Sequence, residues 1–348
     1  MTNDQKLPFL IFGAGAIGTY IGGSLALAGH QVHYLEKERD IPLLKQQGLH
    51  LTLGENKHHL TGVDFFDSLA ILERINYQLA ILALKTYHLE AILPELIKFR
   101  DILPPVLCLQ NGVEGEKRLA DALGDQGVIP GTVTSAVDRL DKGKIKVQKR
   151  RGMGIAGDHP RVNAFQQAFN QAALNCRVYA TAEGMKWSKL IINLLGNASS
   201  AILDLTPSAI YAHPGLFRME LEQIREGFRV MRKGQIPTVN LPGVPVNLLA
   251  AAVKTLPGAV SQSVLSSMIG KGRGEKMPSF HIDLHSGRGQ TEVNALNGAV
   301  VRAGEHWGVP TPVNRFLTNR LLRLNAGEIP LDKYHNKPDL LLQELESN

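Results

Sequence analysis

An amine and two carboxamides recur every four residues in an apolar stretch near the middle of the chain. They are Lys189, Asn193 and Asn197, and the positions between them are mostly leucine and isoleucine. One helix over residues 186–197 would place all three on the same side. Buried polar groups need partners, so these side chains either bond neighbouring backbone or line a cleft. In the second case they would supply one proton donor and two orienting amides.

A second dense polar stretch covers residues 278–292 and includes Ser279, Asp283, Arg288 and Glu292. Glu292 stands at the start of a predicted long helix over 291–307. A carboxylate in that position is stabilised by the helix dipole. Arg288 could pair with Glu292 or with Asp283. The stretch therefore has both a structural and a functional interpretation.

A glycine-rich turn lies near the N-terminus, where Gly13, Gly15 and Gly18 enclose Ala14, Ala16 and Ile17. An apolar run over 8–12 predicts a buried strand before it, and a helix over 19–28 and a strand over 31–35 follow. This context makes the motif informative, because strand, glycine turn, helix and strand together bind dinucleotides. Gly13 permits the tight turn, Gly15 admits the pyrophosphate, and Gly18 lets the helix pack on the strand. The helix N-terminus would face the phosphates with free N–H groups.

Two opposing signals for the cofactor stand at the end of the second strand. Glu36 occupies the place where an acidic residue accepts the ribose 2′-OH of NAD. Lys37 and Arg39 follow at once and could bind the 2′-phosphate of NADP instead. The sequence leaves the choice between NADPH and NADH open.

Strand and helix patterns continue to alternate up to about residue 180, which predicts a doubly wound parallel sheet. A strand over 77–84 delivers Lys85 at its carboxyl end, and a strand over 105–109 delivers Asn111. Ligands of such sheets bind outside the carboxyl ends of the strands. Gly13, Lys85 and Asn111 are therefore expected to converge on one crevice.

The later part of the chain reads as helical. Helices are expected over 216–233, 246–255, 260–269, 291–307 and 312–324, with a flexible loop over 270–274 and irregular structure over 282–289. The fold class is therefore α/β, with an N-terminal Rossmann-like doubly wound sheet and an all-α C-terminal domain. We expect a dinucleotide domain over 1–182, a helical substrate or dimerisation domain over 183–330, and a frayed polar tail over 331–348.

The composition is that of a globular protein, with 44% hydrophobic and 20% charged residues. No apolar run reaches the length of a membrane span, and no secretory signal precedes the first strand. Only two cysteines occur, which favours a reducing cytoplasm. No cluster of metal-ligand spacing is apparent, so no metal is expected. The oligomeric state is left open, with a homodimer as one candidate.

Much of the net charge of +6 lies in residues 142–151. Lysines there alternate with Ile145 and Val147, which predicts an edge strand with a solvated basic face. Because no aromatic residues are interleaved with the lysines, a nucleic-acid partner is not expected. A mildly positive field also suits an anionic cofactor and a carboxylate substrate.

Taken in order, these motifs resemble the ketopantoate reductase family over nearly the whole chain. The resemblance is carried by the glycine turn, Leu84-Lys85, Gln110-Asn111-Gly112, the 186–197 stretch, Ser279 with Asp283, Thr291-Glu292, and Gly308-Val309-Pro310. It implies NADPH-dependent reduction of 2-dehydropantoate to (R)-pantoate, a step of pantothenate synthesis.

The resemblance also implies roles for individual residues. Lys189 would be the general acid, with Glu292 assisting it and contacting the cofactor. Asn193, Asn197 and Ser279 would bind the substrate. Lys85 and Asn111 would lie beside both the nicotinamide and the substrate, with Asn111 as a further substrate-binding residue. This fits the chemistry, because an alkoxide formed by hydride transfer to a 2-keto acid needs both a charge and a proton.

Four positions depart from the family pattern: Glu36, Phe280, Ile282 and Asn294. They leave open an NAD-dependent dehydrogenase of another branched or aromatic D-2-hydroxyacid on the same fold. A third alternative is a non-catalytic, dinucleotide-sensing regulatory protein. Such a sensor would need the glycine turn but would not need Lys189.

Overall fold

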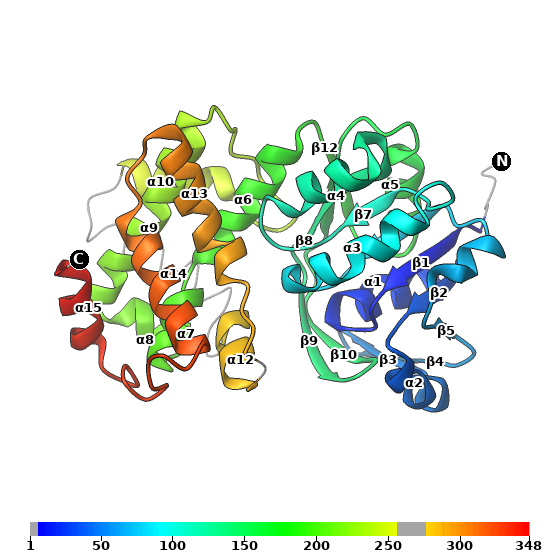
Figure 1. Cartoon of the computed structure of the whole chain (residues 1–348), viewed down its shortest axis with the longest axis horizontal. Helices are drawn as coiled ribbons and strands as arrows, with labels where there is room; N and C mark the ends of the chain where they lie inside the picture. Colours follow the sequence, from blue (N-terminus) through cyan, green and yellow to red (C-terminus); the bar gives the residue numbers. More distant parts are fainter. Residues whose placement is uncertain (1–5, 256–275, 288, 348) are drawn as a thin grey trace. The chain divides into compact units, whose positions relative to one another are not determined.

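The computed structural model describes residues 6–255, 276–287 and 289–347, which divide into two compact units (Figure 1). Unit 1 comprises Met1–Gln110, Glu114–Lys186 and Leu241–Val244, and unit 2 comprises Asn111–Val113, Trp187–Asn240 and Pro245–Asn348. None of the described helices combines the length and apolar character that crossing a bilayer demands. The predicted helix over 260–269 and loop over 270–274 lie outside the described residues.

Unit 1 is built on an eight-stranded sheet in the order β12-β11-β8-β7-β6-β1-β2-β5. Neighbours from β5 to β8 are parallel, whereas β11 runs antiparallel to β8. The expected α/β class with a parallel-rich sheet is therefore confirmed. The strand bounds are β1 Pro8–Phe12, β2 Gln31–Leu35, β5 Asp64–Phe66, β6 Leu79–Leu82, β7 Val106–Cys108, β8 Val128–Val133, β11 Met153–Ala156 and β12 Cys176–Tyr179.

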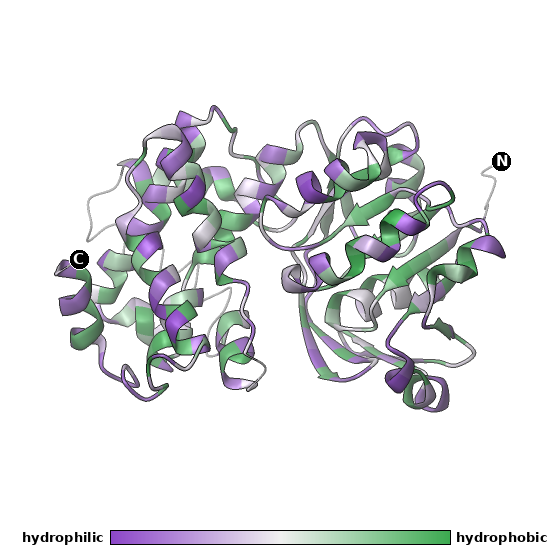
Figure 2. Cartoon of the chain, in the orientation of Figure 1, coloured by the Kyte–Doolittle hydropathy of each residue, from purple (hydrophilic) through white to green (hydrophobic). Residues whose placement is uncertain are grey.

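Helices cover both faces of this sheet. Phe9 and Ile11 of β1 pack in one cluster with α1 (Ala16–Leu27) and α5 (Val162–Gln171). Leu10 and Phe12 alternate to the other face and pack with α3 (Leu89–Lys98) and α4 (Gly115–Leu123). Strands buried on both faces have to be apolar throughout, and Figure 2 shows the central strands as mostly hydrophobic. The remaining helical segments of unit 1 are α2 Ile41–Gln47 and the 3₁₀ turns η1 Glu38–Asp40, η2 Leu69–Glu73, η3 Thr86–His88 and η4 Asp125–Gly127.

A second sheet of four strands has the order β4-β3-β10-β9. Its strands are β3 Leu49–Leu53, β4 Asn56–Leu60, β9 Ala136–Asp141 and β10 Lys144–Lys149. The expected edge strand in the basic run is wrong, because β10 pairs with β3 on one side and β9 on the other. The expected alternation is confirmed: Ile145 and Val147 are buried, whereas Lys146 and Lys149 are exposed.

All the regular secondary structure among the described residues of unit 2 is helical. After α6 (Ala182–Leu194), which begins in unit 1, come α7 Asn197–Leu203, α8 Pro207–Ala212, α9 Pro214–Lys233, α10 Val246–Thr255, α12 Ser279–His285, η5 Val293–Ala295, α13 Asn297–Trp307, α14 Pro312–Asn325 and α15 Pro338–Glu346. Figure 2 shows hydrophilic and hydrophobic residues mixed along α9 and α14, as expected for helices with one buried face.

Three expectations for unit 2 are wrong. The stretch after Ile282 is not irregular, because α12 continues to His285. The predicted helix over 291–307 is split, since the 3₁₀ turn η5 precedes α13. The tail is not frayed: α15 forms there, and Tyr334 and Leu341 are fully buried in the core of the unit. Leu340, Leu342 and Leu345 of the same segment also pack against this core, so apolar side chains anchor the tail.

The helix expected over 186–197 is also interrupted. It ends at Leu194, Gly196 adopts a left-handed conformation with φ of 59°, and α7 begins at Asn197. Lys189 and Asn193 therefore share one face of α6, while Asn197 belongs to the next helix.

Candidate functional site

The glycine turn joins β1 to α1. Gly13 has a positive φ of 91°, and a Cβ atom at Gly18 would lie 1.8 Å from the carbonyl oxygen of Gly13. Both positions thus require glycine for the turn itself. A Cβ atom at Gly15 would meet nothing within 4 Å. The space beside Gly15, at the N-terminus of α1 with Ala16 and Ile17, fits a phosphate group that approaches the backbone.

The side chain of Glu36 is hydrogen-bonded to this turn. One oxygen of its carboxylate accepts a hydrogen bond from the backbone N–H of Ala14 at 2.5 Å, and the other accepts from the N–H of Lys37 at 3.1 Å. The side chain is only 6% exposed. Lys37 and Arg39, by contrast, are exposed beside it.

Lys142 also contacts Glu36, although the two residues are far apart in the sequence. Its amine lies 3.2 Å from the carboxylate of Glu36 and 2.6 Å from that of Asp40. Burial acts to raise the pKa of Asp40, but the hydrogen bond and charge of Lys142 hold that pKa below its ordinary value. The expectation that Lys142 belongs to a solvated basic face is therefore wrong. No local signal marks a contact between residues 106 positions apart, and only the fold brings it about.

Lys85 follows β6 and begins the turn η3. It is half-buried, and its carbonyl accepts a hydrogen bond from the side chain of Gln110 at 3.1 Å. The predicted placement of Lys85 after a buried strand is confirmed, although β6 ends three residues earlier at Leu82.

Lys186 is a buried cation that the sequence analysis did not single out. Its side chain is 5% exposed and lies 2.5 Å from the carboxylate of Glu116. Its amine also donates to the carbonyls of Gln110 at 2.6 Å and Gly131 at 3.2 Å. Lys186 therefore connects the segment after β7 with β8 and α4 and has a structural role.

In unit 2 a continuous chain of hydrogen bonds joins most of the predicted substrate residues. The amide of Asn111 donates to Glu292 at 3.2 Å, and the amide of Asn193 donates to the side-chain oxygen of Asn111 at 3.1 Å. The amide of Asn197 donates to the carbonyl of Asn193 at 3.1 Å and to the hydroxyl of Ser279 at 3.4 Å. The five polar residues come from three separate stretches of the sequence, with Asn193 and Asn197 in one and Ser279 and Glu292 in another.

The exposure of these side chains differs. Glu292 is 1% exposed and Asn197 is 2% exposed, whereas Asn193 is half-buried. Lys189 is also half-buried and stands one turn before Asn193 on the same face of α6. The arrangement offers an amine, a carboxylate, amides and a hydroxyl in one unit.

The break between α6 and α7 is held by Glu220, which the sequence analysis missed. This fully buried carboxylate of α9 accepts hydrogen bonds from the N–H of Gly196 at 2.7 Å, the hydroxyl of Ser199 at 2.6 Å and the hydroxyl of Tyr211 at 3.1 Å. The side-chain amide of Gln223 also donates to it at 3.4 Å, and a buried carboxylate with four donors is rigidly placed. Glu220 therefore sets where Asn197 lies relative to Asn193. A glycine directly before a second helical pattern is the one signal that could have indicated the break.

Chemically, such a site suits a small anionic substrate with a carbonyl group. Amides and a hydroxyl can orient a carboxylate, and an amine can give a proton to a developing alkoxide. The buried carboxylate of Glu292 is held in place by its hydrogen bond from the Asn111 amide.

Family models match both parts of the chain. A model described as "Ketopantoate reductase PanE/ApbA" matches residues 9–160, and a model described as the C-terminal part of the same family matches residues 181–325.

Relatives and solved structures agree with these matches. A protein of Pyrococcus horikoshii named 2-dehydropantoate 2-reductase is 26% identical over 315 residues, which is 88% of this chain and 94% of that protein. A ketopantoate reductase of Ralstonia eutropha superposes with a TM-score of 0.78 at 23% identity, covering 92% of this chain and 99% of that one. D-Mandelate dehydrogenase, solved with NADH and anilino(oxo)acetate, has a TM-score of 0.74 at 20% identity, with the same coverage.

Proposed function

Because the chain belongs to the ketopantoate reductase family, we propose that it reduces 2-dehydropantoate to (R)-pantoate with NADPH. The observation that carries the proposal is the hydrogen-bonded chain from Glu292 through Asn111 and Asn193 to Asn197 and Ser279. A merely structural polar cluster would not require a half-buried lysine on the same helix face as Asn193.

In this proposal Lys189 is the general acid. A bound nicotinamide cofactor supplies the hydride to the keto carbon. Lys189 stabilises the negative charge that develops on the carbonyl oxygen and then gives it a proton. Glu292 favours the charged form of the amine, and Asn111 keeps Glu292 oriented.

Asn193 and Ser279 bind the polar groups of the substrate in the proposal. Asn197 is also a substrate ligand in the family pattern. In addition, its amide donates a hydrogen bond to the hydroxyl of Ser279 and so helps to position it. Gly13, Gly15, Ala16, Ile17 and Gly18 form the pyrophosphate turn, with Lys85 beside the nicotinamide.

The preference for NADPH rests on the surroundings of Glu36. Its charge is balanced by Lys142, and its oxygens are engaged by two backbone N–H groups. The carboxylate therefore repels a 2′-phosphate less than a free one would, while Lys37 and Arg39 remain exposed to bind it. We also propose a cytoplasmic location, in keeping with Cys108 and Cys176 as free thiols.

A second candidate is NADH-dependent reduction of another branched or aromatic 2-keto acid. It is favoured by the presence of an acidic residue at the end of β2 and by the fold shared with D-mandelate dehydrogenase, which was solved with NADH.

The test is a spectrophotometric assay of the purified protein with 2-dehydropantoate, run in parallel with NADPH and NADH. The proposal predicts rapid oxidation of NADPH and slow oxidation of NADH. Turnover of an aromatic 2-keto acid with NADH, and none with 2-dehydropantoate, would replace it with the second candidate. Tight cofactor binding without turnover of any 2-keto acid would instead favour a regulatory sensor.

A further inference from the structure

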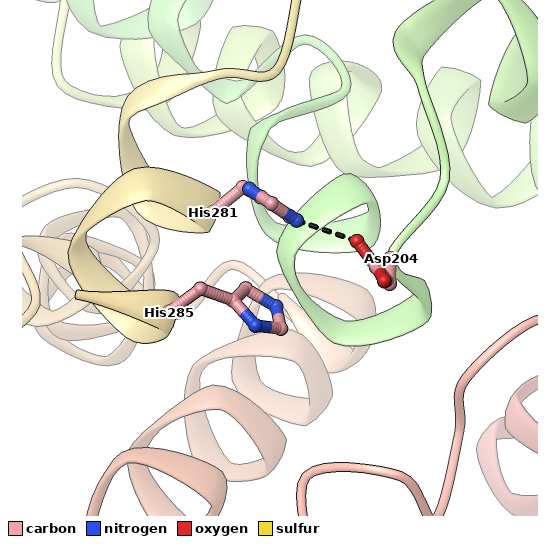
Figure 3. A group of neighbouring side chains, drawn as sticks. All are labelled: Asp204, His281 and His285. Carbon is pink, nitrogen blue, oxygen red and sulfur yellow. Dashed lines mark hydrogen bonds and ion pairs between the residues drawn. The ribbon is translucent and has the colours of Figure 1, made fainter. Parts of the chain in front are cut away.

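A group of metal-ligand side chains lies in unit 2, apart from the hydrogen-bonded chain described above. Asp204 follows the end of α7, and His281 and His285 project from α12 toward it (Figure 3). Each residue offers one ligand atom, and these atoms lie within 4.8 Å of one another. The two histidines are four residues apart, so one face of α12 carries both.

We propose that Asp204, His281 and His285 bind a divalent transition-metal ion of the zinc class. Imidazole nitrogens and a carboxylate oxygen are the ligands that Zn²⁺ takes in proteins, and three protein ligands leave a fourth position for a water or another side chain. Two histidines at i and i+4 on a helix are a recurrent zinc-binding pair. No metal was expected from the sequence, although the spacing of His281 and His285 is visible in it.

The geometry already gathers the ligands. A ring nitrogen of His281 lies 2.6 Å from one carboxylate oxygen of Asp204. The rings of His281 and His285 stack with centroids 4.2 Å apart. A bound ion would take the place of the direct contact between His281 and Asp204, with a small adjustment of the side chains.

The backbone directs one of the ligands. Asp204 is held in a left-handed conformation, with φ of 52°. Backbone strain of this kind is typical of functional sites, where the side chain must point in one direction.

A third histidine lies close to the same carboxylate. A ring nitrogen of His335 lies 3.3 Å from the second oxygen of Asp204. The segment is fastened there, because the N–H of Asn336 donates to the carbonyl of Leu203 at 2.9 Å. Three histidine rings therefore surround the carboxylate of Asp204, more than one ion pair would need. His335 is the candidate for the fourth metal ligand.

An ion at this place would join the end of α7 to α12. The first residue of α12 is Ser279, and the N–H of Phe280 is bonded to Asn197. The metal would therefore brace the segment that carries Ser279. The proposal does not depend on the reaction proposed above.

The test uses full-length protein stripped with a chelator and dialysed. Zn²⁺ is titrated against a chromogenic indicator, and Co²⁺ is added separately to record the visible bands of a tetrahedral ion. We expect one site per chain. His285→Asn should weaken it by at least about 10–100-fold, which is the loss seen even for an outer-shell partner. His285 is exposed, so this variant should fold.

Asp204→Asn is the second ligand variant, because asparagine tolerates the left-handed conformation and keeps the size of the side chain. The matched control is His306→Asn, an exposed histidine on α13 of the same unit. Binding lost in both ligand variants and kept in the control supports the site. No stoichiometric binding by the wild type, or binding that neither ligand variant weakens, overturns it.

Discussion

Replacing Asn197 with alanine should destabilise unit 2. Asn197 is 2% exposed, and both ends of its amide are used. The oxygen accepts from the N–H of Phe280 at 3.0 Å, and the nitrogen donates to the carbonyl of Asn193 and the hydroxyl of Ser279. Alanine removes all three hydrogen bonds.

The size of the effect follows from what is left unpaired. Phe280 is fully buried, so no water reaches its N–H when the amide is removed. A buried donor without an acceptor costs about 1–3 kcal/mol. The Ser279 hydroxyl can turn to another partner, and the carbonyl of Asn193 lies at the end of a helix, so these losses are smaller. We expect the free energy of unfolding of unit 2 to fall by about 2–4 kcal/mol.

Tryptophan fluorescence measures this unit selectively. The chain has two tryptophans, Trp187 and Trp307, and both belong to unit 2. Their ring centroids are 6.4 Å apart. Unfolding in guanidinium chloride, followed by this signal, gives the midpoint and slope for wild type and variant.

Asn193→Ala is the matched control, since Asn193 is half-buried and donates one side-chain hydrogen bond, to Asn111. Its stability loss should stay below about 1 kcal/mol, while its KM for the keto acid should rise. Equal stability losses in the two variants, or a wild-type midpoint for Asn197→Ala, would refute the reasoning from burial.

Three further predictions concern unit 1. Lys186→Met should lower its stability by about 3–5 kcal/mol, because Glu116 is left buried without its cation, and adding Glu116→Leu should recover most of the loss in circular dichroism melts. Burial lowers the pKa of His33, although Asp64 acts against it. The unfolded state therefore takes up a proton that the folded state does not, and stability should fall as pH drops from about 7 to 5. His33→Gln should flatten that dependence, and an unchanged slope would exclude His33 as its source. Glu36→Ala should shift the ratio of kcat/KM values toward NADPH, and no shift would mean that Lys37 or Arg39 already controls the ribose site.

The sequence predicted the core of unit 1 well for a physical reason. Strands such as β1 and β6 are buried on both faces, so they read as apolar runs, and the glycine turn marks the end of β1. The predictions were wrong where contacts between residues far apart in the sequence determine the structure. Nothing local indicates that β3 would pair beside β10, or that Tyr334 and Leu341 would draw a polar tail into the core.

The sequence predicted which residues form the candidate site, but it did not predict how their side chains are arranged. Residue types and order indicated Asn111, Asn193 and Glu292, but their bonds join positions up to 181 residues apart. The break at Gly196 depends on Glu220, a buried residue that reads as an ordinary helix-surface glutamate in the sequence. A carboxylate buried by tertiary packing leaves no periodic signal.

The central claim is that Lys189 gives the proton in a hydride-transfer reaction. Its most direct test compares Lys189→Met with wild type in two measurements: kcat for 2-dehydropantoate, and the Kd of NADPH by fluorescence titration. If Lys189 is the proton donor, kcat should fall about 10²–10⁴-fold while the Kd of the cofactor is unchanged. A variant that keeps wild-type turnover, or that loses turnover and cofactor affinity equally, would contradict it.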